Sequence, residues 1–312
     1  MQAIIPPVAR EDIERELTPE RFLRHSNKGD NHLYVVDAHC APAVMREIGR
    51  LREESFRQAG GGTGAPLDID EFDTMPEPCR QLIVWNPRER EILGGYRFIT
   101  GDKIDMSSGV PRIATSHLFR FSTRFLTEYL PQTLELGRSF VAPPFQSTKA
   151  GTHALFALDN LWDGLGALTV IYPEMKYLFG KVTMYPAFGR RNLDILLGFL
   201  LKHFPDHDDL VTPLRPVSTA ALSPEIQGLF AGNSYKEDYR ILHHLIREQG
   251  LNIPPLVNAY MSLSPTMRVF GTSVNEEFGN VEESGIFLTI AEILDEKKMR
   301  HIETYKEEIS NE

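Results

Sequence analysis

The pattern of hydrophobic and polar positions along the chain predicts four long helices. In the segment 42–58 the apolar residues fall at helical spacing and would share one face of a helix. These residues are Val44, Ile48, Leu51 and Phe56. Helices are also predicted at 152–172, 190–203 and 236–249. The glycine-rich run 60–64 ends the first helix and predicts a mobile loop.

Shorter runs between these helices are typical of strands. They are predicted at 33–37, 81–85, 91–100, 134–141 and 177–185, with a closing pair at 267–274 and 285–293. The turn at Asn86-Pro87-Arg88 predicts that 81–85 and 91–100 form a hairpin, and Pro143-Pro144 ends the strand 134–141.

Strands and helices alternate along the chain, which is typical of an α/β fold built round a mixed sheet flanked by helices. We predict a main domain at 31–294, preceded by a helical arm at 1–30 and followed by a charged helical tail at 295–312. Prolines are frequent in the segment 205–255, which predicts a helical insertion within the main domain.

Composition narrows the classes of function. The 312 residues carry a net charge of -10, so the basic face that nucleic-acid binding requires is not expected. Cys40 and Cys79 lack metal-ligand spacing, and neither a metal site nor a disulfide framework is predicted. The first residues lack the features of a secretory signal, and no apolar run is long enough to span a bilayer. We therefore expect a cytoplasmic protein, with peripheral contact at the inner membrane left open.

Several short motifs occur in a fixed order along these elements. They are Arg52-x-x-x-Phe56, Asp68-Ile69-Asp70-Glu71-Phe72-Asp73, Gly95-Tyr96-Arg97, Leu134-Glu135-Leu136-Gly137-Arg138-Ser139 and Leu161-Trp162-Asp163-Gly164-Leu165, then Ile253-Pro254-Pro255-Leu256, Tyr260 and Phe278. The series resembles the branch of the GNAT superfamily that includes ornithine-lipid and glycine-lipid N-acyltransferases, often labelled hemolysin-like. It is also similar to that of the acyl-homoserine lactone synthases. The resemblance implies a bacterial enzyme with a GNAT-like fold that takes part in lipid biosynthesis.

Two departures from these families bear on the substrates. The glycine-rich loop stands where the homoserine lactone synthases have a tryptophan, which disfavours a signalling molecule as product. The stretch 146–152 lacks an intact GNAT pyrophosphate loop. That disfavours coenzyme A and favours acyl carrier protein, whose 4'-phosphopantetheine offers a single phosphate. No permanently bound cofactor is expected.

Glu135 is the candidate general base. N-acylation requires a neutral amine, and an amino acid's amine is mostly protonated near neutral pH, so a base must take a proton from it directly or through water. The alternative is that Glu135 only pairs with Arg138.

Arg138, Arg97, Asp70 and Asp73 are expected to form one charge network above the thioester, since arginine suits bidentate carboxylate pairing. In this interpretation Asp73 locks a loop and Asp70 meets the acceptor's ammonium. The alternative is a network that only fixes the loop to the sheet. Substrate contacts are assigned to Arg52 and Phe56, and to Trp162 as one wall of an acyl tunnel or as a core residue.

The thioester is expected at the end of the strand 134–141. Backbone N–H groups near Phe140 and Val141 would stabilise the oxyanion, and the pantetheine arm would lie along the strand. The phosphate would meet the turn that leads into the next helix, where free N–H groups favour an anion. The residues assigned there are Gln146, Lys149, Gly151 and Thr152.

These assignments lead to one predicted reaction. A long fatty acyl group, 3-hydroxylated in the related enzymes, would pass from acyl carrier protein to the amine of glycine or ornithine. Two alternatives stay open: an acetyl-coenzyme A-dependent N-acetyltransferase on the same fold, and a non-catalytic, membrane-associated hemolysin-like protein.

Overall fold

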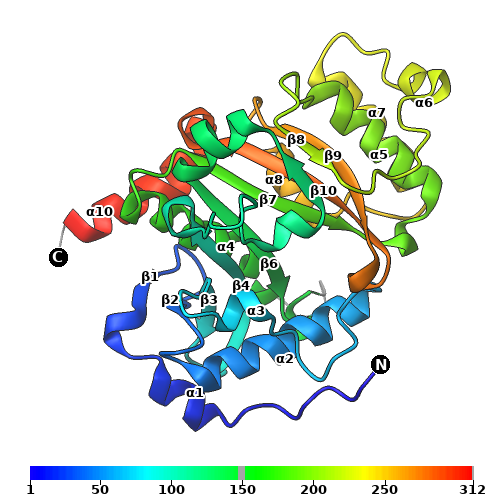
Figure 1. The fold of residues 1–312 in the computed structure, drawn as a ribbon. Helices are drawn as coiled ribbons and strands as arrows, with labels where there is room; N and C mark the ends of the chain where they lie inside the picture. Colours follow the sequence, from blue (N-terminus) through cyan, green and yellow to red (C-terminus); the bar gives the residue numbers. More distant parts are fainter. Residues whose placement is uncertain (147–151, 311–312) are drawn as a thin grey trace. The chain divides into compact units, whose positions relative to one another are not determined.

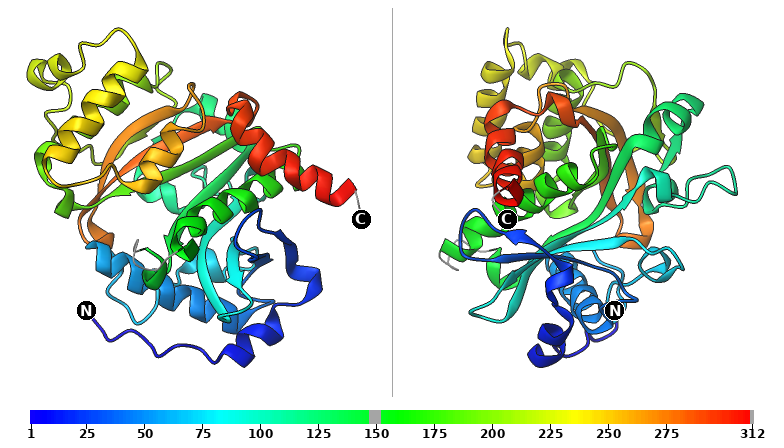
Figure 2. Two further views of the ribbon diagram at one scale, coloured as in Figure 1. Left: turned by 180° about the vertical axis from the view of Figure 1, so that it is seen from behind. Right: turned by 90° about the vertical axis from the view of Figure 1, so that its left-hand side faces the viewer.

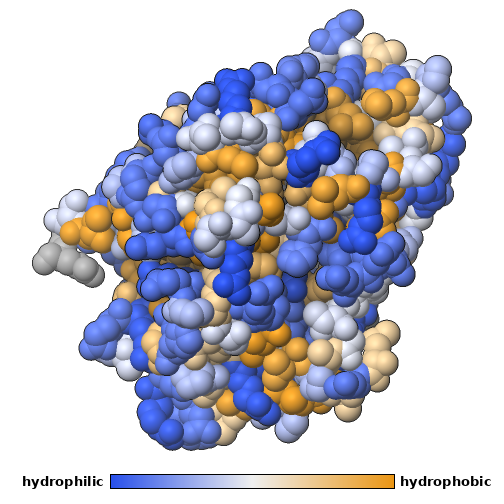
Figure 3. Space-filling view, in the orientation of Figure 1, coloured by the Kyte–Doolittle hydropathy of each residue, from blue (hydrophilic) through white to orange (hydrophobic). Residues whose placement is uncertain are grey.

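The computed structural model of the chain describes residues 1–146 and 152–310. They form two compact units. Unit 1 comprises Met1–Ala114, Pro131–Lys176 and Asp295–Glu312, and unit 2 comprises Thr115–Leu130 and Tyr177–Leu294. Hydrophilic residues cover most of the face shown in Figure 3, with hydrophobic side chains scattered between them. Within the described residues, no helix combines the length and apolar character needed to cross a bilayer.

Unit 1 is built on five antiparallel strands in the order β1-β2-β3-β4-β6 (Figure 1). The strands are β1 (Phe22–His25), β2 (His32–Val36), β3 (Arg80–Asn86), β4 (Glu91–Thr100) and β6 (Thr133–Val141). Its helices are α1 (Arg10–Glu16), α2 (Pro42–Ala59), α3 (Glu71–Thr74), α4 (Thr152–Ile171), α9 (Asp295–Lys298), the π-helix η11 (Met299–Glu303) and α10 (Thr304–Ser310). Short 3₁₀ turns are η1 (Pro19–Arg21), η2 (Gly101–Lys103) and η6 (Pro143–Phe145), while η5 (Leu130–Gln132) begins at the last residue of a unit 2 segment and continues into unit 1.

The two long helices of unit 1 cover opposite faces of its sheet (Figure 2). Arg52 of α2 donates to Gln81 of β3, so α2 lies on the face to which Gln81 points. Leu82, the next residue, points to the other face. A Cβ added at Gly164 of α4 would lie 2.6 Å from the side chain of Leu82, so α4 packs closely there.

Three buried polar side chains and the exposed Asn27 fasten the C-terminal segment to α4. Asp163 accepts from the Asn27 backbone N–H at 2.9 Å, and its Oδ1 lies 2.7 Å from His301 Nδ1. Arg24 donates to the carbonyl of His301 at 3.3 Å. We call Arg24, Asn27, Asp163 and His301 the Asp163 cluster. A Cβ at Gly166 would lie 2.2 Å from the carbonyl oxygen of His301, so only glycine admits this approach.

Unit 2 contains the antiparallel sheet β7-β10-β9 and the strand pair β5-β8. The strands are β5 (Phe119–Phe121), β7 (Tyr177–Met184), β8 (Val211–Pro213), β9 (Arg268–Asn275) and β10 (Val281–Thr289). The helices are α5 (Arg190–His203), α6 (Pro224–Leu229), α7 (Tyr235–Glu248), α8 (Pro255–Met261) and the π-helix η4 (Phe125–Tyr129), with 3₁₀ turns η8 (Pro186–Phe188), η9 (Glu276–Phe278) and η10 (Ile290–Glu292). One more 3₁₀ turn, η3 (Ala114–His117), crosses from unit 1 into unit 2.

The periodicity predicts the long elements closely. The helices predicted at 42–58, 152–172, 190–203 and 236–249 occur within one residue at either end. The strand predicted at 285–293 begins four residues earlier, at Val281. The stretch 1–30, predicted as helical, also contains β1, and 205–255 also contains β8. Such short strands carry too few residues to show a period of two.

The glycine-rich loop 60–64 is better anchored than its composition indicates. Glu53 is buried, and its Oε2 accepts from the backbone N–H of Thr63 at 3.0 Å and from its hydroxyl at 2.7 Å. Its Oε1 accepts from the Gly64 N–H at 2.7 Å. The prediction of a mobile loop did not foresee this anchor.

Candidate active site

A bulge interrupts the pairing of β4 with β6. Gly95 pairs with Phe140 and Arg97 with Gly137, so Arg138 and Ser139 together face only one residue of β4. Arg138 has φ 49°, a left-handed conformation that non-glycine residues seldom adopt. Such bulges re-aim side chains and are frequent beside active sites. Here the bulge directs Arg138 toward the loop that precedes α3.

That loop supplies the acidic half of a buried charge network. Asp70 is the N-cap of α3: its carboxylate accepts from the backbone N–H of Phe72 at 3.0 Å, and Asp73 accepts from the backbone N–H of Asp70 at 3.1 Å. This reciprocal capping fixes both carboxylates on the short helix.

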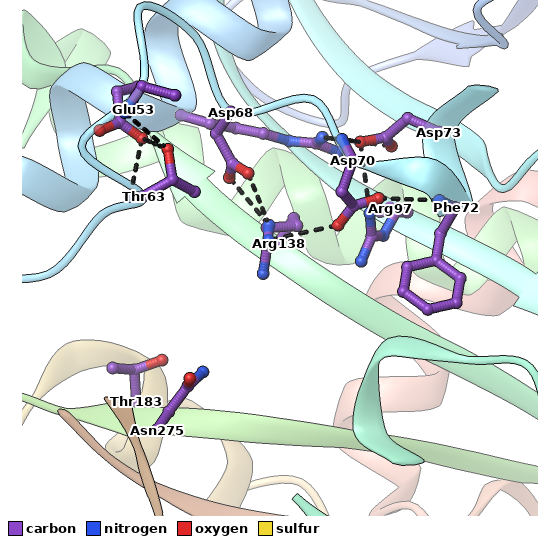
Figure 4. Close-up of polar contacts among 12 residues, drawn as sticks. Glu53, Thr63, Asp68, Asp70, Phe72, Asp73, Arg97, Arg138, Thr183 and Asn275 are labelled. Atoms are coloured by element: carbon purple, nitrogen blue, oxygen red, sulfur yellow. Dashed lines mark hydrogen bonds and ion pairs between the residues drawn. The ribbon is translucent and has the colours of Figure 1, made fainter. Parts of the chain in front are cut away.

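Three arginines from three different elements meet these carboxylates. Arg52 Nη1 lies 3.2 Å from Asp73 Oδ2. Arg97 Nη1 lies 2.6 Å from Asp70 Oδ1 and 3.3 Å from Asp73 Oδ2. Arg138 Nε lies 2.8 Å from Asp68 Oδ2, and its Nη2 lies 3.3 Å from Asp70 Oδ2. Figure 4 shows Asp70 between Arg97 and Arg138. We call this set the arginine–aspartate network; its members are Arg52, Arg97, Arg138, Asp68, Asp70 and Asp73.

The network is neutral as a whole, with three cations and three anions, and it opens to solvent at one edge. The side chains of Arg52 and Asp73 are fully buried, whereas that of Asp70 is 25% exposed. Burial alone would raise the pKa of Asp73, but the Arg52 and Arg97 guanidinium groups outweigh it and hold that pKa well below its usual value. Burial lowers the pKa of Arg97, but Asp73 and Asp70 outweigh it and hold that pKa well above its usual value. Asp73 and Arg97 are therefore both charged at neutral pH.

Glu135 shares the face of the sheet on which this network lies. Residues directly opposite each other in antiparallel strands point to the same face. Arg97 lies opposite Gln81 and Gly137, and Glu135 lies opposite Ile99, two residues from Arg97. Glu135 is 3% exposed.

Gly137 leaves room on this face between Glu135 and the bulge. Among the described residues, a Cβ added at Gly137 would meet only Arg97 Nε, at 4.0 Å. The nearby thiol of Cys79 is no rival nucleophile, because burial raises its pKa to about 12 and leaves it protonated.

The two residues predicted to hold the oxyanion have their backbones turned to opposite sides of β6. Ala142 donates its N–H to Leu93 of β4, whereas the carbonyl of Val141 accepts from Ser55 at 3.2 Å. Because successive residues of a strand alternate, the Val141 N–H points away from β4 and that of Phe140 points toward it. Val141 also lies six residues from Glu135, roughly 20 Å along an extended strand. The bulge lies between Glu135 and Val141. A thioester carbonyl within reach of Glu135 would therefore lie closer to the bulge than to Val141.

The remaining predicted site residues are spread over unit 1. Phe56 is buried on α2, and Trp162 is buried on α4, on the opposite side of the sheet from the network. Gln146 is exposed and donates from its side chain to the Val141 carbonyl at 2.7 Å. Thr152 begins α4. Lys149 and Gly151 lie outside the described residues.

The sequence interpretation assigned no role to Asp68, Gln81 and Ser55. Asp68 belongs to the quoted Asp-x-Asp motif, and its pairing with Arg138 depends on the bulge, which leaves no signal in the sequence. Gln81 donates to Asp73 at 2.9 Å; a glutamine among the apolar residues of β3 is the one signal that could have found it. Ser55 gives no such signal.

Among residues 1–146 and 152–310, no three histidine, cysteine, aspartate or glutamate side chains gather in a way that could hold a metal ion.

Comparison with known proteins decides the family. Residues 51–155 match the model of an acetyltransferase (GNAT) domain. The chain is 58% identical over 308 residues to the glycine N(alpha)-acyltransferase of Bacteroides thetaiotaomicron, covering 98% of this chain and 91% of that one. It is 55% identical over 306 residues to the glycine N(alpha)-acyltransferase of Phocaeicola vulgatus, covering 98% and 94%. The chain belongs to the GNAT N-acyltransferase family. The predicted GNAT-like fold and acyltransferase activity are thereby confirmed.

Two solved structures of a CoA-dependent acyl-homoserine lactone synthase also match. The structure with SAM and isopentyl-CoA is 17% identical, with a TM-score of 0.30 over 52% of this chain and 70% of the synthase. The structure with MTA is 16% identical, with a TM-score of 0.32 over 53% and 72%.

Proposed function

We propose that this GNAT N-acyltransferase transfers a long, 3-hydroxylated fatty acyl group from acyl carrier protein to the amino group of glycine, forming the lyso form of an aminolipid. The observation that carries the proposal is the identity of 58% over 98% of the chain with a glycine N(alpha)-acyltransferase. Glycine could lie above Gly137, where an added Cβ would meet only Arg97 Nε among the described residues, at 4.0 Å. The product is amphiphilic, so peripheral contact with the inner membrane forms part of the proposal.

In the proposed reaction the amine nitrogen attacks the thioester carbonyl carbon. The nitrogen–carbon bond forms, the carbon–sulfur bond breaks, and the pantetheine thiol leaves with a proton. Glu135 is the base that takes the proton from the acceptor's ammonium, directly or through one water molecule. Its buried position on the face of the network supports this role, because water is largely excluded there.

Asp70 is the proposed contact for the acceptor's ammonium, because it is the network carboxylate at the open edge. Arg97 and Arg138 hold Asp70 from both sides and fix its orientation. Arg52, Asp73 and Phe56 hold this arrangement on α2 and α3 rather than touch the acceptor. Trp162, on the other face of the sheet, is assigned to the core.

The donor's pantetheine arm would run along β6 from the bulge toward Val141 and Gln146. A backbone N–H group of β6 near the bulge would stabilise the oxyanion, with Ser139 nearer to Glu135 than Val141. The phosphate would then reach the segment with Lys149 and Gly151 and the start of α4 at Thr152. The departure of this segment from the GNAT pyrophosphate pattern favours acyl carrier protein over coenzyme A.

The test is a product assay by mass spectrometry. The enzyme is incubated with 3-hydroxyacyl and unsubstituted acyl carrier protein, with the matching coenzyme A thioesters, or with acetyl-coenzyme A. Each donor is combined with glycine, ornithine or serine. We expect N-acylglycine from the long-chain carrier donors. N-acetyl product alone would favour a short-chain acetyltransferase, and no N-acyl product from any pair would refute the proposal.

A steric variant tests the acceptor position separately. Gly137→Val adds a branched side chain that strands accommodate well, so the fold is expected to stay intact. The side chain fills the space beside Glu135, and the KM for glycine should rise about tenfold or more, since the acceptor loses its place. An unchanged KM in a folded variant would put the acceptor elsewhere.

A further inference from the structure

One side of α7 in unit 2 is devoted to packing. Leu242 and Ile246 are fully buried, as is Asp238 in the first turn. Asp238 accepts from Lys202 Nζ at 2.6 Å and lies 2.8 Å from His203 Nε2, both on α5. The apolar contacts and this buried ion pair hold α7 rigidly in place, so its outer side is a fixed surface (Figure 2, left, yellow helix).

The outer side of α7 carries a straight row of basic residues. Lys236, Arg240, His243 and Arg247 are all exposed. At about 100° per residue their spacing of four, seven and eleven places them within a sector of roughly 60°. With about 1.5 Å of rise per residue the row is roughly 16 Å long. We call these four residues the α7 basic face.

The charges of this face are not neutralised by neighbours. Within the part of the chain that the structure describes, Lys236, Arg240 and Arg247 have no ion pair. Glu248 lies at the flank of the face, 3.2 Å from His244 Nε2. The whole chain has a net charge of -10, so the positive charge of this face is opposite in sign to that of the chain as a whole. Such a row attracts an anionic partner and raises its association rate.

The shape of the face indicates a protein partner. An amphipathic helix that binds a membrane surface presents large apolar residues to the lipid. Here the apolar residues point inward and the outer row is polar. A row of roughly 16 Å is also longer than one phosphate group needs. It matches instead one side of an acidic helix, with carboxylates spaced three and four residues apart.

We propose that the α7 basic face is the docking surface for the acyl carrier protein that delivers the thioester. This inference rests on the proposed function, which supplies the one macromolecular partner of the reaction. The GNAT domain match ends at residue 155, so α7 lies outside it and is free to serve a need that acetyl-coenzyme A enzymes lack.

The experiment reverses the charges and compares donors. The triple variant Lys236→Glu, Arg240→Glu, Arg247→Glu changes only exposed side chains and should fold. Its kcat/KM with acyl carrier protein should fall about tenfold or more, while kcat/KM with the carrier-free acyl-pantetheine thioester stays within about twofold. The matched control is Arg15→Glu, Arg88→Glu, Arg191→Glu. The side chains of these residues are 74%, 75% and 68% exposed. The control therefore changes the net charge by the same amount as the α7 variant, at other exposed positions.

Binding is measured in parallel, independently of catalysis, by fluorescence anisotropy of labelled holo acyl carrier protein. Wild-type binding should weaken with salt, and the α7 variant should lose it while the control keeps it. If the wild type binds the carrier through α7 but forms no N-acyl product, the proposed function is refuted and the docking surface is still supported. Equal carrier binding by variant and control, or no binding by wild type, would overturn the docking surface. Loss of binding to anionic phosphatidylglycerol vesicles alone, with carrier binding intact, would also overturn it and indicate a membrane contact.

Discussion

The arginine–aspartate network and the Asp163 cluster belong to opposite faces of the same sheet in unit 1. Both join polar or charged side chains that are far apart in the sequence, and both are mostly buried, although Asn27 of the Asp163 cluster is exposed. They differ at their edges. The network ends at the part-exposed Asp70 and at Arg138 in its left-handed bulge, beside the open position at Gly137. The Asp163 cluster ends against the C-terminal segment, whose backbone touches Gly166.

The difference shows that burial and charge pairing do not by themselves identify an active site. Asp163 is as deeply buried as Asp73, and each accepts several hydrogen bonds. What separates the two regions is backbone strain and access. A network with a strained arginine beside the open position at Gly137 can meet a substrate, while the Asp163 cluster holds chain segments together. The predictions below separate catalysis from stability on that basis.

The largest effect is expected from Glu135→Gln. The change keeps the size of the side chain and removes its ability to take a proton, so kcat should fall about 10²–10⁴-fold, which is typical for loss of a general base. The midpoint of thermal unfolding should stay close to that of wild type. Steady-state kinetics with glycine and circular dichroism melts measure the two quantities.

The control for this variant is Glu89→Gln in the exposed β3–β4 turn, which should behave as wild type. If the kcat of Glu135→Gln is within tenfold of wild type, Glu135 is not the general base, and its role is to pair with neighbouring charges.

The next effect concerns stability alone. Asp163→Ala leaves His301 and Asn27 without their buried acceptor, and the free energy of unfolding should fall by about 3–5 kcal/mol. The kcat of the protein that remains folded should be unchanged. Asp73→Ala should cost as much stability and lose activity as well, because it releases Arg52 and Arg97.

Urea unfolding and active-site-normalised kinetics distinguish the two aspartates. Asp12→Ala is the control, because its ion pair with Arg15 joins side chains that are 49% and 74% exposed, and it should cost no more than about 1 kcal/mol. A large loss of kcat in folded Asp163→Ala would mean that the Asp163 cluster also serves catalysis.

A smaller effect is expected where the C-terminal segment meets α4. Gly166→Ala places a methyl group against the carbonyl oxygen of His301, and the backbones must move apart. Overpacking of this kind costs about 1–3 kcal/mol. At Gly228 in α6 an added Cβ meets none of the described residues within 4 Å, so Gly228→Ala should be neutral or slightly stabilising by thermal melts. If the two variants are equally stable, the C-terminal segment can move away from α4 at little cost in free energy.

The two regions also differ in how far the sequence predicts them. Arg97, Arg138, Asp70 and Asp73 were expected to form one network, because their motifs occur in a fixed order on successive elements, and the structure brings them together. The Asp163 cluster was not foreseen, although Asp163 belongs to a quoted motif. Its partner His301 lies 138 residues away in a charged tail without any motif. Only the folded backbone, with glycine at position 166, makes that contact possible.

The same limit applies to finer features of the site. The bulge at Arg138 has no signature in residue type, since arginine shows no preference for a left-handed conformation. The predicted oxyanion residues Phe140 and Val141 have opposite backbone orientations, which depend on the register of β6 against β4. Periodicity predicts that a strand exists, but pairing decides which N–H groups it leaves to a ligand.

The smallest expected effect is the acid response of the network. Because the pKa of Asp73 lies well below its usual value of about 3.9, its charge stabilises the fold fully above that value. The contribution is lost as pH falls from about 4 toward the lower pKa of the folded state. Asp73→Asn removes the titrating group. The difference in unfolding free energy between wild type and this variant should therefore be constant from pH 7 to 5 and shrink by about 1 kcal/mol or more by pH 3. Urea unfolding at each pH measures it, and a difference that persists unchanged at pH 3 would mean that Asp73 is not held by its charge. Such a result would make the network a structural tie, like the Asp163 cluster.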